Sequence, residues 1–111
     1  MRRVWLAVLL AALPAIALAA GALSPSTLAA NPSSYDGKTV TVSGTVSHFQ
    51  TSSTMMGTVA GFQLCDTKCI VVIDQKNTAR TDGSSATVTG TFHVTFKGPH
   101  KTFSNAVVIG R

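Results

Sequence analysis

Two cysteines separated by three polar residues constrain the fold of this chain more than any other feature. Cys65 and Cys69 flank Asp66-Thr67-Lys68, and apolar segments lie at residues 61–64 and 70–73. Two apolar segments joined by three to five polar residues predict a β-hairpin. In a tight hairpin the cysteines lie opposite each other with Cβ atoms about 4.5–5.5 Å apart, close to the roughly 3.5–4.5 Å that a disulfide needs. The sequence therefore predicts a hairpin closed by a Cys65–Cys69 disulfide.

A metal-binding pair and a redox dithiol are the alternatives to a structural disulfide. Structural zinc sites normally have four protein ligands, and redox motifs are usually Cys-x-x-Cys. Here the spacing is Cys-x-x-x-Cys and the chain holds only these two cysteines. The spacing favours the disulfide, and the alternatives stay open at this point.

The N-terminus has the layout of a secretory signal. Met1-Arg2-Arg3 is basic, residues 4–13 are apolar, and small residues follow at Ala17-Leu18-Ala19 and Ala20-Gly21-Ala22. This order predicts a signal peptide over residues 1–22, cleaved near Ala22, and a domain over residues 23–111. The alternative is an uncleaved anchor, but the apolar run barely reaches the about 20 residues that a membrane helix needs. We expect a periplasmic or secreted protein with no stable membrane anchor after cleavage. An oxidising compartment also suits a disulfide.

Alternating residues predict the strands of the domain. In residues 39–48, Val40, Val42 and Val46 alternate with Thr and Ser, so one face is apolar and the other polar. Further strands are expected at residues 58–64, 69–74, 85–96 and 103–109, a short helix at 24–31, and a polar loop at 49–57. Pairing the cysteines places Leu64 opposite Ile70 and Phe62 opposite Val72, and an inward-facing Phe92, Val94 and Phe96 are expected on the fourth strand.

Five strands with a long, glycine-containing first strand predict an all-β fold, a small five-stranded OB-fold (Greek-key) barrel with a short N-terminal helix. The chain also resembles the tRNA_anti-like class of OB-fold domains. The resemblance rests on residues 31–38 followed by Val40-x-Val42-x-Gly44-x-Val46, and on residues 86–92 with their central Gly90. It covers about residues 24–110. It implies the OB-fold, and nucleic-acid binding is an activity of cytoplasmic relatives.

In OB-folds, ligands lie across the second and third strands, between the first and last hairpin loops. That rule selects seven candidate ligand-binding residues here: Phe49, Gln63, Val71, Ile73, Lys97, His100 and Lys101. A basic loop opposite apolar residues suits an anionic, partly apolar ligand. The alternative for Lys97, His100 and Lys101 is a solvated hairpin tip.

The charge of the chain gives nucleic acid only weak support as a partner. The net charge is +5, and removal of Arg2 and Arg3 with the signal leaves +3, without the clustered arginines of a nucleic-acid footprint. The single Trp, Trp5, lies in the predicted signal, so few aromatic side chains are left to stack on bases. Nucleic acid, another anionic ligand and a protein partner remain open.

A periplasmic Cu(I) carrier is the alternative function. His48, Met55 and Met56 supply imidazole and thioether groups, which are ligands that favour Cu(I). The set loosely resembles that of small periplasmic copper-carrier OB proteins, which add a Trp that this chain lacks in its domain. Adjacent methionines in an extended segment would also point to opposite sides.

Catalysis has little support in the sequence. The chain has four acidic residues, Asp36, Asp66, Asp74 and Asp82, all at expected turns or strand ends, where Asp side chains bond to backbone. No Gly-x-Ser-x-Gly elbow or Gly-rich phosphate loop is present. We expect a non-enzymatic binding module without a cofactor.

Overall fold

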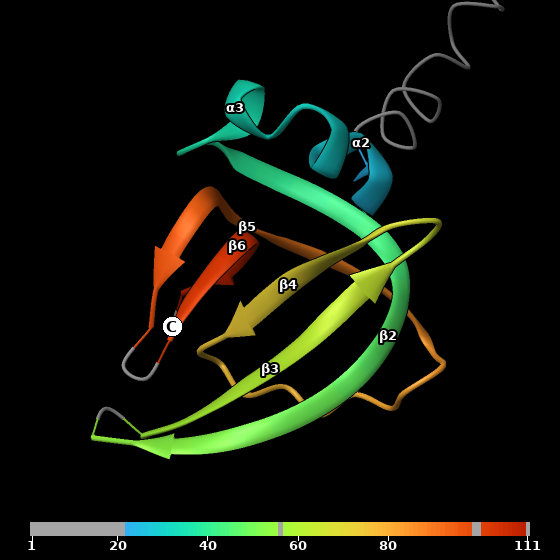
Figure 1. Cartoon of the computed structure of the whole chain (residues 1–111). Coiled ribbons are helices and arrows are strands. Elements are labelled where there is room, and N and C mark those ends of the chain that lie inside the picture. The colour runs from blue at the N-terminus through green and yellow to red at the C-terminus, as the bar shows by residue number, and fades with distance from the viewer. Residues whose placement is uncertain (1–21, 56, 99–100, 111) are drawn as a thin grey trace, which may run out of the picture.

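The computed structural model describes residues 22–55, 57–98 and 101–110, most of them in β-strands (Figure 1). The predicted signal segment lies outside the described residues except for Ala22. Within the described residues, no helix is long and apolar enough to cross a membrane. The elements are β1 (Ala22–Leu23), α2 (Pro25–Ala30), α3 (Pro32–Tyr35), β2 (Thr39–Thr54), β3 (Gly57–Cys65), β4 (Cys69–Asp74), β5 (Ser85–Lys97) and β6 (Thr102–Ile109).

The long strand β2 organises the sheet. Residues Thr39–Thr45 of β2 pair antiparallel with β5, and Thr45–Thr54 pair antiparallel with β3. β3 pairs with β4, β4 runs parallel to β6, and β6 pairs with β5. The pairing thus passes from β2 through β3, β4, β6 and β5 and returns to β2, which curves across the other strands (Figure 1). β1 adds two residues parallel to β2.

The alternation expected for the first strand is confirmed. Val40, Val42 and Val46 are buried, and they join a core formed by the inward side chains of β3, β4, β5 and β6. The most deeply buried large side chains include Phe92, Leu64, Ile70 and Val72. The core is therefore the shared inner face of the sheet, as the period-two pattern requires.

The expected loop at residues 49–57 is wrong, because β2 continues through Thr54 and β3 begins at Gly57. Pairing shifts between Ser47 and Gln50, so that two residues of β2 lie opposite one residue of β3. His48 at this bulge has φ 56°, a left-handed conformation that non-glycine residues adopt rarely. A run of Gln, Ser and Thr has no apolar alternation, so only its pairing with β3 marks it as strand.

The cysteine hairpin forms with the predicted register. Cys65 and Cys69 are joined by a disulfide with Cα atoms 4.1 Å apart, and their Cα atoms are partners in the β3–β4 ladder. Leu64 pairs with Ile70 and Phe62 with Val72, as expected. Because both sulfurs are in the disulfide, metal binding by these thiolates is excluded in this state.

The tip of that hairpin also holds the N-terminal helix. Asp66 accepts hydrogen bonds from the Ser26 backbone N (3.1 Å) and the Ser26 hydroxyl (2.7 Å), and one from Lys68 N (3.1 Å). The Ser26 hydroxyl, followed by the Lys68 amide, lowers the pKa of Asp66. α2 forms within the expected segment, Ser24 caps it, and Leu28 is completely buried. Figure 1 shows α2 and α3 together over one end of the sheet. The second helix, α3, was not expected.

The other aspartates also bond to backbone amides. Asp36 accepts from Val94 N at 2.9 Å and Asp82 from Phe49 N at 2.9 Å, and each joins segments far apart in the chain. Asp74 is buried and accepts from the two amides of Lys76 and Thr78 that follow it in the 75–84 connector. All four carboxylates of the chain thus stabilise loops and strand ends.

Replacing both cysteines by serine is expected to lower the free energy of unfolding by about 2 kcal/mol, the entropy of closing so short a loop. Urea unfolding of the Cys65→Ser, Cys69→Ser protein measures the loss, and wild type unfolded with and without a thiol reductant is the control. A double variant as stable as wild type would show that the disulfide does not stabilise the hairpin.

Candidate ligand-binding groove

A groove of about 770 Å³ lies on the outer face of β2, β3 and β4, opposite the core. Its floor is formed by Val59, Gly61, Val71 and Ile73, with Gln63 beside them. The ladder explains this arrangement, because Gln63 pairs with Val71 and Gly61 with Ile73. Their neighbours Leu64, Ile70 and Val72 point the other way, into the core. The alternation that builds the core therefore also builds the groove floor.

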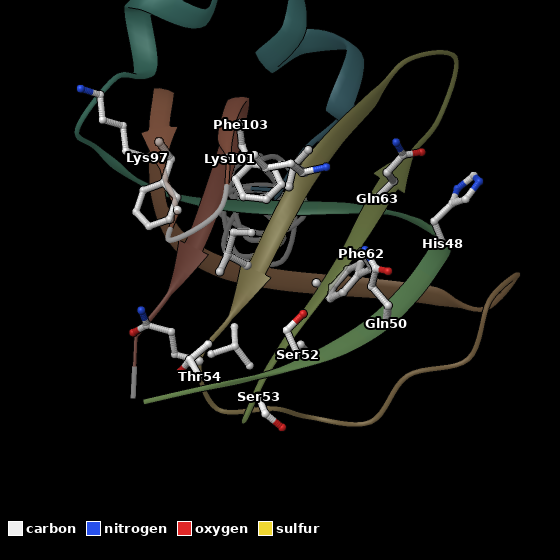
Figure 2. Close-up of a pocket in the computed structure, with 18 of the residues that line it drawn as sticks. His48, Gln50, Ser52, Ser53, Thr54, Phe62, Gln63, Lys97, Lys101 and Phe103 are labelled. Atoms are coloured by element: carbon white, nitrogen blue, oxygen red, sulfur yellow. The ribbon is translucent and has the colours of Figure 1, made fainter. Parts of the chain in front are cut away.

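Two projecting hairpins form the walls. The end of the β2–β3 hairpin extends beyond β4, since β4 ends at Asp74, the partner of Ala60. This end contributes Ser52, Ser53 and Thr54, and Gln50 lies just before it on β2, opposite Gly61. The end of the β5–β6 hairpin extends beyond the part of β6 that pairs with β4, which starts at Ala106. Figure 2 shows the labelled residues of the two hairpins on opposite sides of the groove.

Five of the seven predicted ligand-binding residues line this groove: Gln63, Val71, Ile73, Lys97 and Lys101. They come from three strands and the segment before β6, so the fold brings together residues that are up to 38 positions apart in the sequence. His100 lies outside the described residues. The fold thus brings these five residues together on one surface.

Phe49 is the predicted site residue that lies elsewhere. Its ring packs against the core, with its centroid 6.1 Å from that of Phe62. In an unbroken strand, residue 49 would share the outer face with Ser47. The bulge at His48 adds one residue, and this turns Phe49 inward and Gln50 outward into the groove wall.

Several groove residues were not predicted, and the aromatic pair Phe96 and Phe103 is the most prominent of them. Phe96 was expected in the core, and it does lie on the same strand face as the buried Phe92. The core ends before it, because the hairpin projects beyond β4, so Phe96 is half-buried and lines the groove with its ladder partner Phe103. The sequence signal was available: two Phe residues flank the basic turn at residues 97–102 at equal distance from its centre.

The aromatic pair lies next to the cations of the groove. The Lys101 ammonium is 5.1 Å from the centroid of the Phe103 ring, within cation–π range. Lys97 pairs with Thr102 at the end of the same hairpin. Among the described residues that line the groove, none is acidic. The electrostatic field of this wall therefore favours an anion.

The Cu(I) set is not brought together. His48 and Met55 lie seven residues apart along β2 and its turn, which is roughly 23 Å at about 3.3 Å per residue. Figure 2 shows His48 and Thr54, the neighbour of Met55, at different ends of the groove. The His48 ring is hydrogen-bonded through Nδ1 to the Ser47 hydroxyl at 2.7 Å. Met55 is fully exposed, and Met56 lies outside the described residues. The described part of the chain also holds no group of three His, Cys, Asp or Glu side chains suited to a metal.

Comparisons with protein-family models, with curated proteins and with solved structures found no match to this chain.

Proposed function

We propose that this chain is an exported OB-fold binding module without enzymatic activity, and that the groove is its binding site. The pairing order supports the fold. Strands β2, β3, β4, β5 and β6 take the places of the five OB strands, with the parallel β4–β6 pair and the return from β5 to β2 that a Greek-key barrel requires.

The position of the groove is the observation that carries the binding function. It lies on the face of the second and third barrel strands, between the first and the last hairpins, where OB-folds bind their ligands. Its volume is within the range of about 300–1,000 Å³ that is typical of small-molecule sites. An apolar floor beside two lysines and no acidic lining suits an anionic, partly apolar ligand.

If the predicted signal over residues 1–22 is removed on export, the functional protein is the cleaved, exported chain. Cleavage after Ala22 leaves only Leu23 of β1, whereas cleavage after Ala19 keeps both residues that pair with β2. The mass of the protein recovered from the exported fraction distinguishes the two sites. A full-length protein retained in the membrane fraction would contradict the signal proposal.

The groove is tested by filling it from its floor. A Cβ added at Gly61 meets no heavy atom closer than 3.9 Å, so the strand has room for a side chain there. Gly61→Leu adds apolar bulk to the floor, and Gly61→Ala is the matched control. The probe is 1-anilinonaphthalene-8-sulfonate, which has one anionic group and an apolar body. Its binding is measured by the NMR shifts of the backbone amides.

We expect the shifts to gather at Gln63, Val71, Ile73 and Lys101 in wild type and in the alanine variant, and to be lost in the leucine variant. The groove would be contradicted as the binding site if the shifted amides were those of the outer Thr and Ser residues of β2 and β5. It would also be contradicted if the shifts persisted in the leucine variant.

A further inference from the structure

The positive charge of the groove is confined to one wall. Lys97 and Lys101 lie at the end of the β5–β6 hairpin, and both are exposed. The facing side offers neutral polar groups, the amides of Gln50 and Gln63 and the hydroxyls of Ser52, Ser53 and Thr54. Among the described residues of the groove there is no arginine and no further lysine. His48 is the one other titratable side chain there, and it is bonded to Ser47.

The four remaining cations of the described chain do not line the groove: Lys38, Lys68, Arg80, and Lys76, which follows the groove residue Gln75. Arg80 lies over the Phe62 ring, 5.3 Å from its centroid, and near the buried Asp74 at 4.0 Å. Lys38 precedes β2, and Lys68 is in the turn of the cysteine hairpin. A polyanion needs cations spaced along its length, since each phosphate contact is a separate charge neutralisation. This groove has no such track.

The apolar part of the groove begins where the charge ends. Phe96 and Phe103 lie beside the two lysines, and the floor continues from them over the half-buried Val71 and Ile73. At Gly61 the floor has no side chain, which leaves width above it for a ligand. One charged end followed by an apolar surface is the complement of a molecule with the same polarity.

From this arrangement, and resting on the proposed binding function of the groove, we infer that the ligand is an amphiphile with a single acidic head group. The head group, a carboxylate or a phosphate, lies between Lys97 and Lys101. The apolar body lies over Phe103, Val71 and Ile73, and the neutral wall of Gln50 and Gln63 borders it. A charge-assisted hydrogen bond to a lysine ammonium contributes most of the binding free energy of the head group. Burial of apolar surface contributes that of the body.

The test compares ligands that differ only in the head group. Calorimetric titration uses decanoate, decyl phosphate and decanol, each below the concentration at which it forms micelles, and an eight-residue oligothymidylate as the polyanion. We expect the two acidic amphiphiles to bind at least ten-fold more tightly than decanol. Their affinity should fall weakly with salt, as one ion pair requires, whereas a polyanion loses affinity in proportion to its number of contacts.

Lysine variants test whether Lys97 and Lys101 bind the head group. Lys97→Ala with Lys101→Ala should lower decanoate affinity about ten-fold and leave decanol unchanged. Lys38→Ala with Lys76→Ala is the matched control, because both lysines are exposed and lie outside the groove lining. We expect this control to bind all ligands like wild type.

Four outcomes overturn the inference. Equal affinity for decanoate and decanol removes the head-group site, and so does an equal loss in the control variant. Tighter binding of the oligothymidylate in the groove, with a steep salt dependence, assigns the groove to a polyanion and leaves the proposed binding function intact. If none of these ligands shifts the amide signals of Gln63, Val71 and Ile73, the proposed function of the groove fails together with the inference.

Discussion

Replacing Gly90 with alanine is expected to lower the free energy of unfolding by about 3 kcal/mol, the upper part of the range for overpacked sites. A Cβ at this position would lie 2.5 Å from the carbonyl oxygen of Val108 and 3.0 Å from the Val107 side chain. The first contact is with backbone, so no side-chain rotation relieves it. On its other edge β5 is paired with β2, where Gly90 lies opposite Val40, so β5 cannot shift freely. Relief requires β5 and β6 to separate.

Urea unfolding followed by circular dichroism measures this loss, with Gly61→Ala as the control. Both glycines are in strand interiors, but the nearest atom to a Cβ at Gly61 is 3.9 Å away, so the control should stay within about 0.5 kcal/mol of wild type. Equal stability of the two variants would show that β5 and β6 do not approach as closely as described.

Replacing Asp74 with alanine is expected to cost about 3 kcal/mol of folding stability. Its side chain is 1% exposed and accepts hydrogen bonds from Lys76 N at 2.9 Å and Thr78 N at 3.2 Å. Alanine leaves these two amides without their acceptor and removes the anion near the largely buried Arg80 guanidinium. Hydrogen bonds to a charged group contribute about 1.5–3 kcal/mol each, and loss of one partner also leaves the other desolvated.

Asp82→Ala is the matched control for Asp74, because that carboxylate is exposed and accepts one bond, from Phe49 N. We expect it to cost about 1 kcal/mol or less. Thermal and urea unfolding of both variants, at a pH where carboxylates are ionised, give the comparison. If the two substitutions cost the same, burial of Asp74 is not what makes its bonds strong.

The hairpin register and the inward-facing valines were predictable because both are local. Three residues separate Cys65 from Cys69, and strict alternation fixes which face of residues 39–46 is buried. The same two facts predicted Gln63, Val71 and Ile73 on the outer face. Lys97 and Lys101 were selected because ligands of OB-folds lie between the first and last hairpins, and the groove lining includes both.

The parts that escaped prediction depend on pairing between distant segments. Residues 49–54 are strand because β3 pairs with them, and the bulge at His48 that turns Phe49 inward has no marker in its own sequence. Phe96 could be assigned to the correct face, but not to the groove, because the point at which β4 stops covering β5 and β6 is a property of the whole sheet.

The pairing of β2 with β5 also has a consequence for the order of folding. Thr39 pairs with Thr91, so the first half of β2 stays unpaired until a strand that lies 52 positions later in the chain is in place. The β3–β4 hairpin needs only a three-residue turn, and pairings of long sequence separation form more slowly than local ones. Unpaired strand edges in partly folded chains are prone to aggregate. The Thr and Ser side chains along one face of β2 and β5 are hydrated before these strands pair. In the folded protein Thr41 is hydrogen-bonded to Thr89 at 2.9 Å and Ser43 to Thr87 at 2.7 Å.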